Sequence, residues 1–192
     1  MQAHYQELEK LRLAQTIEVS ADALYRTASD FTLGRADAPI TIVEFFDYNC
    51  GYCKRMFAPI MQMLAANGDV RLVVKEFPIL SQSSVTAAKA GIAAQKQGKF
   101  KSFHTEMMTY RGPVNDASIM QAAGAAGLDL DRLKQDMDSP ETAAIITRTR
   151  SAAAALNING TPGLVIGDTV IPGAIGMEEL QTAIDKERTK QG

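Results

Sequence analysis

The sequence predicts a single α/β domain with a helical insertion, and three observations lead to this prediction. First, a strand-like run, Ile40–Phe46, precedes a Cys-x-x-Cys motif, a helix-like run and a second strand-like run, Val70–Phe77. Strands joined by such a helical crossover are expected to pair in parallel. Second, alanine-rich helical patterns replace strand signals in residues 85 to about 155. Third, the chain returns to two short apolar runs and a final helix, Met177–Arg188.

The composition fits a compact protein with one core. The chain has 192 residues and 46% hydrophobic content, so it can bury a core without disulfide staples. Its net charge of -2 provides no basic surface, so no nucleic-acid partner is expected. No run approaches the ~18 apolar residues of a membrane span, and the first residues lack the basic and apolar regions of a signal peptide. Taken literally, this start predicts a cytoplasmic protein, although a mature fragment with an added methionine would begin in the same way.

Residues 1–30 are expected to form an N-terminal helix and a connector. Apolar side chains recur among polar ones up to about residue 17, at Tyr5, Leu8, Leu11, Ala14 and Ile17. A helix this short is marginal alone in water, so its apolar stripe must dock either on its own domain or on copies of itself. Glu18–Arg35 is interpreted as a connector with a turn of helix at Ala21–Thr27.

The Cys50-Gly51-Tyr52-Cys53 motif holds both cysteines of the chain and lies between a strand and a helix, which indicates a redox motif. Cys50 at the helix N-cap would lie against unpaired backbone N–H groups, whose partial positive charge stabilises a thiolate. Cys50 is therefore predicted to be the nucleophile. Cys53 follows three positions later on the same side of the turn and is predicted to resolve the mixed disulfide.

Other uses of the two thiols are open. A structural zinc site needs four ligands, and beyond the cysteines the chain offers only His4 and His104. Copper(I) can bind two soft thiolates, so a copper(I)-binding protein is the alternative function. Two inert buried cysteines would be unusual at a strand-to-helix junction. Redox chemistry without a metal or organic cofactor is the preferred prediction.

The rest of the chain divides at the helical stretch. Residues 31–84 are predicted to form the first part of the main domain, 85–140 the helical insertion and 141–192 the second part. In the second part, Leu164–Ile166 and Thr169–Ile171 flank a Gly-Asp pair and are expected to form a tight antiparallel hairpin.

The order of these elements resembles a thioredoxin fold of the DsbA type. The residues from Glu44 to Cys53, Glu-Phe-Phe-Asp-Tyr-Asn-Cys-Gly-Tyr-Cys, are similar to those of its bacterial members, closest to the ScsC and Com1-like branch. The resemblance covers about residues 30–190. The resemblance implies a periplasmic protein disulfide oxidoreductase or isomerase. Its expected partners are unfolded or misoxidised protein substrates and a membrane redox partner. ScsC-like proteins are similar in carrying an N-terminal oligomerising segment, so a homo-oligomer through residues 1–17 is expected.

Thr161-Pro162 is a second element of the resemblance. In this family the equivalent peptide bond is cis and places the proline beside the cysteines, while the backbone of the preceding residue pairs with an extended substrate peptide. Thr161 and Pro162 are thus expected to bind substrate, with Gly51 and Tyr52 flanking the same groove. Many strongly oxidising members carry His where this chain has Tyr52, which leaves the oxidising strength open.

Two charged residues interrupt the apolar strands. Glu44 lies six residues before Cys50, where burial would raise its pKa and let it exchange the proton of Cys53, so it is the candidate general base. Lys75 looks like the lysine that neighbours this acid in thioredoxin-like proteins. Strand alternation puts Lys75 and Glu76 on opposite faces, so only one of them can face Glu44, and an exposed edge position for Lys75 is the alternative.

Oxidase and isomerase would use the same atoms. An isomerase benefits from two or more sites held around one misfolded client, a geometry that joined N-terminal helices could supply. Isomerase or general interchange is therefore favoured over dedicated oxidation. His104 is interpreted as a helix-face residue and the methionines as mostly core.

Overall fold

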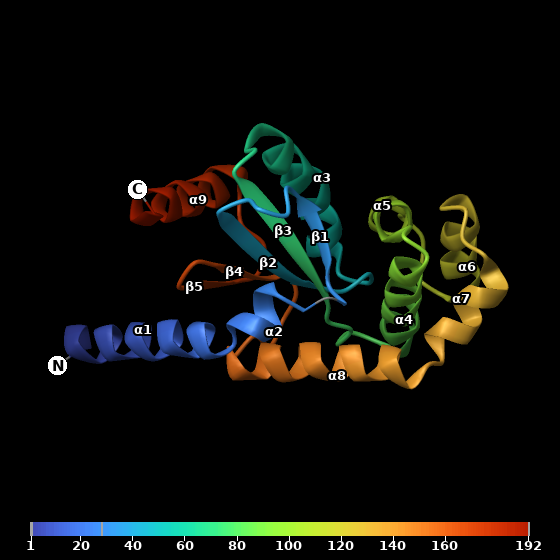
Figure 1. The fold of residues 1–192 in the computed structure, drawn as a ribbon, viewed down its shortest axis with the longest axis horizontal. Helices are drawn as coiled ribbons and strands as arrows, with labels where there is room; N and C mark the ends of the chain where they lie inside the picture. Colours follow the sequence, from blue (N-terminus) through green and yellow to red (C-terminus); the bar gives the residue numbers. More distant parts are fainter. Residues whose placement is uncertain (1, 28, 192) are drawn as a thin grey trace.

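The computed structural model describes residues 2–27 and 29–191 and shows a five-stranded mixed sheet at the centre of the molecule (Figure 1). The strands lie in the order β1-β3-β2-β4-β5. Their bounds are β1 (Phe31–Gly34), β2 (Ile40–Phe46), β3 (Val70–Glu76), β4 (Gly163–Ile166) and β5 (Thr169–Pro172). As predicted, β2 and β3 pair in parallel, and the other pairs are antiparallel.

Helices cover both faces of the sheet and form a separate layer at one end. The described helices are α1 (Gln2–Val19), α2 (Ala21–Tyr25), α3 (Gly51–Ala66), α4 (Gln82–Lys96), α5 (Phe100–Thr109), α6 (Asp116–Ala125), α7 (Leu130–Met137), α8 (Pro140–Ala155) and α9 (Met177–Gln191). In Figure 1, α3 and α9 lie on one face of the sheet, α2 and α8 lie on the other, and α4 to α7 stand beside it. The predicted α/β class with inserted helices is confirmed.

Alternation along β2 divides the core and positions the site. Ile42 and Phe46 join the cluster that contains Cys53 from α3. Val43 and Phe45 join a second cluster on the opposite face, together with residues of α8. Glu44 falls between Val43 and Phe45 in the strand, so its side chain points to the same face as the cysteines.

The connector expected at Glu18–Arg35 contains a strand that the sequence did not predict. β1 pairs with the edge of β3 in antiparallel register. β1 is only four residues long, which is too short for the alternating apolar pattern that predicts a strand. It ends at Gly34, whose φ is 92°. A side chain at Gly34 would also place its Cβ only 2.7 Å from the carbonyl oxygen of Val70. This glycine therefore permits the close approach of the two strands.

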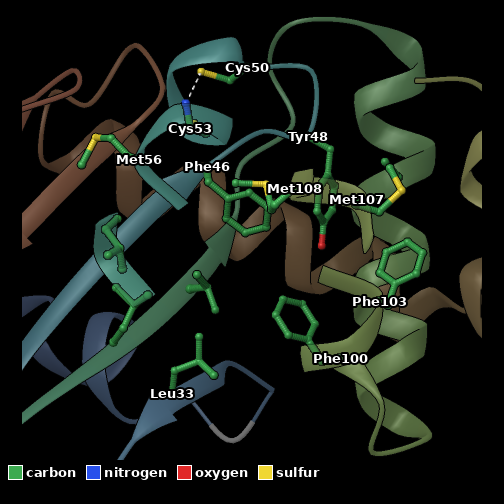
Figure 2. Packing of buried hydrophobic residues seen from close by; sticks show 14 of the residues in the cluster. Leu33, Phe46, Tyr48, Cys50, Cys53, Met56, Phe100, Phe103, Met107 and Met108 are labelled. Carbon is green, nitrogen blue, oxygen red and sulfur yellow. Dashed lines mark hydrogen bonds between the residues drawn. The ribbon is translucent and has the colours of Figure 1, made fainter. Parts of the chain in front are cut away.

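The helical layer packs onto the same core as the cysteine motif. Figure 2 shows Phe100, Phe103, Met107 and Met108 of α5 in the cluster that also contains Cys53. The prediction of core methionines is confirmed for Met107 and Met108, which are buried. Helices follow one another from α4 to the end of α8 among the described residues, and α8 also packs on the sheet.

The predicted N-terminal helix forms as α1, but its apolar positions do not make one face. A three-residue spacing falls behind the helical turn by about 60° at each step, so the stripe winds around the helix. Ile17 at one end is buried against the core, and Leu13 packs beside it. At the other end, Tyr5 is 64% exposed and Leu11 is 60% exposed. Docking on the protein's own domain therefore accounts for only the last part of the helix.

Candidate active site

Cys50 occupies the N-cap of α3, directly after the loop that follows β2. Its φ and ψ of -75° and 111° are extended rather than helical, and its Sγ accepts a hydrogen bond from the backbone N–H of Cys53 at 3.3 Å (Figure 2). An oxygen-bearing side chain usually fills this role. Here a sulfur receives the unpaired N–H of the helix and its partial positive charge.

Hydrogen-bond donors lower the pKa of Cys50 to about 6. The largest contribution is the hydrogen bond from the Cys53 thiol, followed among the lowering causes by the Thr161 side chain and the backbone N–H groups of Cys53 and Tyr52. Partial burial opposes them. Since each donor stabilises the anion more than the neutral thiol, Cys50 is mostly thiolate at pH 7.

Cys53 lies one turn further along α3 and is completely buried, whereas Cys50 is 5% exposed. Both cysteines are free thiols in this structure. The pKa of Cys53 is strongly raised, first because its thiol donates to Cys50, then by burial and by the charge of Glu44. The two sulfurs thus differ in the way that a nucleophile and a resolving thiol must differ.

Glu44 is buried on the sheet face beneath these cysteines, and its Oε1 has no hydrogen-bond partner among the described residues. The pKa of Glu44 is raised to about 8. Burial is the larger cause, and the negative charge of Cys50 is the smaller one. The predicted pKa rise is therefore found. The carboxyl group is largely protonated at pH 7 while Cys50 carries a charge.

The Thr161-Pro162 peptide bond is cis, as the resemblance implied. It comes just before β4 and brings the Thr161 carbonyl to 3.2 Å from Cys50 Sγ, where the thiol form donates to it. The Thr161 hydroxyl is buried and has no hydrogen-bond partner among the described residues. The Thr161 side chain is nevertheless one of the groups that lower the pKa of Cys50. The structure thus brings seven of the eight predicted residues together, all but Lys75.

Gly51 and Tyr52 form the exposed first turn of α3 beside Cys50. Tyr52 is 59% exposed, and the guanidinium of Arg55 lies 4.2 Å from the centre of its ring. This cation–π contact holds an aromatic surface at the mouth of the site. Their predicted contact with substrate stays a prediction.

The prediction that Lys75 neighbours Glu44 is wrong. The register pairs Glu44 with Val74 and Lys75 with Phe45, so Lys75 points to the opposite face of the sheet. There it is buried, donates to the carbonyl of Ala23 and forms an ion pair with Asp30. Burial lowers the pKa of Lys75 and raises that of Asp30. Lys75 supports the packing of α2 rather than the chemistry of the cysteines.

Three polar residues that precede Cys50 were not predicted to belong to the site. Asp47 and Tyr48 are buried, and Asn49 is half-buried, with hydrogen bonds to α4, α5 or the segment between β3 and α4. His104 of α5, interpreted as a helix-face residue, bonds to Tyr48, and burial lowers its pKa to about 3. The sequence feature that could have indicated their role is their position, because these three polar residues lie directly between an apolar strand and the nucleophile.

A low-pKa cysteine at a helix N-cap, a buried partner thiol, a buried acid and a cis-proline are together typical of the thioredoxin-fold family of thiol–disulfide oxidoreductases. The family model described as the DSBA-like thioredoxin domain matches residues 41–185. The chain belongs to this family.

Solved structures agree with this assignment. A thioredoxin-like oxidoreductase from Silicibacter pomeroyi is 39% identical, with a TM-score of 0.85 over 88% of this chain and 97% of that one. A linker-deletion variant of Proteus mirabilis ScsC is 27% identical, with a TM-score of 0.89 over 98% of this chain and 88% of that one. A periplasmic thioredoxin-like protein from Salmonella enterica is 27% identical, with a TM-score of 0.79 over 88% of this chain and 95% of that one.

The matching curated relatives are longer proteins. They include the Na(+)/H(+) antiporter NhaA 3 of Salinispora tropica, which is 27% identical over 157 residues, 81% of this chain. The chain spans 24% of that protein's length. In residues 2–27 and 29–191, no helix is both long enough and apolar enough to cross a membrane.

Proposed function

We propose that this protein exchanges thiols and disulfides on unfolded or misoxidised protein substrates in the periplasm, and that isomerisation or general interchange is its main activity. The observation that carries the proposal is the asymmetry of the pair: Cys50 has a lowered pKa and keeps 5% exposure, whereas Cys53 has a raised pKa and is completely buried. The periplasmic name of the Salmonella relative and the confinement of both cysteines to one motif support the location. A membrane redox partner would reset the pair.

The exchange takes place in two steps that conserve electrons. The Cys50 thiolate attacks one sulfur of a client disulfide, so a Cys50–client bond forms and the other client sulfur leaves as a thiolate. An incoming client thiolate can then release Cys50, which completes isomerisation. Alternatively, Cys53 loses its proton to Glu44 and attacks Cys50, which closes the enzyme disulfide and releases a reduced client. In the reverse direction the enzyme disulfide oxidises a client dithiol.

The electrostatics of Glu44 favour this order of events. The charge of the Cys50 thiolate is one cause of the raised pKa of Glu44. That charge disappears when Cys50 joins a client in a mixed disulfide, so the pKa of Glu44 falls. A larger fraction of Glu44 is then ionised, and only the ionised carboxylate can accept the proton that Cys53 must lose.

Refolding of ribonuclease tests the proposal. Reduced wild-type protein is expected to reactivate scrambled ribonuclease faster than oxidised protein oxidises the reduced enzyme, and Cys50→Ser is expected to do neither. A copper(I) titration under reducing conditions tests the alternative. No activity on either ribonuclease, together with a tight stoichiometric copper(I) site that Cys50→Ser abolishes, would contradict exchange and favour a copper carrier.

The exposed part of α1 supports a homo-oligomer. Tyr5, Leu8 and Leu11 are large apolar side chains, each more than 40% exposed, on a helix that extends from the body of the molecule (Figure 1). We expect Leu11→Glu to reduce the mass in solution to that of a monomer and to slow isomerisation, because charge at a helix interface is costly. Gln6→Glu adds the same charge at another exposed position and is the control. A wild-type monomer by sedimentation would refute the assembly but not the exchange chemistry.

A further inference from the structure

The loop before Cys50 is fastened to the segment that leads into the helical layer. The buried carboxylate of Asp47 accepts the backbone N–H groups of Ile79 and Leu80 at 2.9 and 3.0 Å on one oxygen, and that of Asn49 at 2.8 Å on the other. The Asp47 carbonyl accepts the N–H of Cys50 at 2.9 Å. This one residue therefore orders the loop and ties it to the Ile79–Leu80 segment.

Tyr48 makes a second, deeper connection. Its hydroxyl is hydrogen-bonded to Nδ1 of His104 on α5 at 3.1 Å, and its ring packs edge-on against Phe46 and Phe103. A Cβ on Gly91 of α4 would lie 3.1 Å from the same hydroxyl. The side chain of Tyr48 is thus enclosed by α4 and α5, and it serves the core.

Asn49 makes the third connection, nearest to the reacting sulfur. Its Nδ2 lies 3.1, 3.1 and 2.9 Å from the hydroxyl oxygens of Ser81, Ser83 and Ser84. Ser81 is the N-cap of α4, where its Oγ accepts the N–H of Ser84. An amide NH₂ has two protons, so it satisfies two of these acceptors at a time. Asn49 directly precedes the nucleophile, and its side chain links this part of the loop to the first turn of α4.

We propose that Asn49 is a positioning residue that clamps the Cys50 loop to α4 and so holds the nucleophilic sulfur among its hydrogen-bond donors. The inference rests on the proposed role of Cys50. The Cys53 N–H donates to Cys50 Sγ at 3.3 Å, and such bonds weaken steeply with distance and misalignment. Asp47 and Tyr48 are buried and hold the protein's core together, whereas Asn49 is half-buried and adds little apolar packing. Its contribution therefore falls on the geometry of the adjacent Cys50.

Alkylation of the full-length reduced protein tests this role, because iodoacetamide needs no protein substrate. In Asn49→Ala we expect the rate at pH 6 to fall by about two- to fivefold, the change that a rise of half to one pKa unit in Cys50 produces. At pH 9, where Cys50 is ionised in both proteins, the rates are expected to agree. Two titratable groups, Cys53 and Glu44, act on Cys50, and both are present in the variant and in the wild type.

Gln97→Ala is the matched control. Gln97 bonds the backbone of Asp129 through both ends of its amide, at 2.9 and 3.1 Å, within the helical layer and away from Cys50. It should leave the alkylation profile unchanged. The proposal is overturned if Asn49→Ala alkylates at the wild-type rate at pH 6, if its rate is equally reduced at pH 9, or if Gln97→Ala has the same effect. A protein that is inactive only in the ribonuclease assays would contradict the proposed function. The alkylation rates would still test the role of Asn49, because they need no protein substrate.

Discussion

A Cys53→Ser variant is expected to accumulate as covalent adducts with client proteins, whereas Cys50→Ser forms no adducts and has no measurable exchange activity. Cys53 is completely buried, so a client disulfide cannot reach it, and its raised pKa keeps it in the unreactive thiol form. Cys50 has a pKa of about 6, so its thiolate form outnumbers its thiol form by about ten to one at pH 7. Without Cys53, the mixed disulfide at Cys50 loses its internal route of release.

Non-reducing electrophoresis after acid quenching, followed by mass spectrometry of the adducts, measures this outcome. The double variant Cys50→Ser/Cys53→Ser gives the background. Trapping by Cys50→Ser, or equal trapping by both single variants, would show that the assignment of nucleophile and resolving thiol is wrong. The reactivity of Cys50 should fall as the pH drops through about 6, because a lowered thiol pKa sustains the anion only above that value.

The sequence predicts the centre of the fold and most of the site because these depend on neighbours in the chain. The β2–α3–β3 unit follows from the apolar runs and the crossover between them. The roles of Cys50 and Cys53 follow from the start of a helix, and the resemblance supplies the Thr161-Pro162 bond. The β2–α3–β3 unit and the cis bond are confirmed, and the roles of the two cysteines stay predictions.

The features that were missed or misplaced depend on partners distant in the chain. β1 is a four-residue edge strand, and only its pairing with β3 makes it visible. The alternation rule showed that Lys75 and Glu76 point to opposite faces, but the register with β2 decides which of them shares the face of Glu44. The partners of Asn49 lie 32 to 35 residues away, so no local pattern reveals them.

Replacing Glu44 by glutamine is expected to stabilise the reduced protein by about 3 kcal/mol at pH 7 while slowing closure of the enzyme disulfide. The folded protein raises the pKa of Glu44 from 4.5 to about 8, so the folded state retains a proton that the unfolded chain releases between these values. The free energy of unfolding therefore falls by ~1.4 kcal/mol for each pH unit above 4.5, until the folded group also ionises near pH 8. A glutamine has the same shape and does not incur this cost.

Urea unfolding of the reduced proteins at several pH values measures the difference. The stabilisation should be close to zero at pH 4, grow through neutrality and level off above pH 8, whereas Glu106→Gln, at an exposed site on α5, should show no such trend. In the same variant, single-turnover closure of the Cys50–Cys53 disulfide should slow by roughly 10²-fold at pH 7, because the proton of Cys53 loses its acceptor. A stability difference that does not change with pH would mean that Glu44 is not protonated in the folded state, and it could not then serve as the poised acceptor for Cys53.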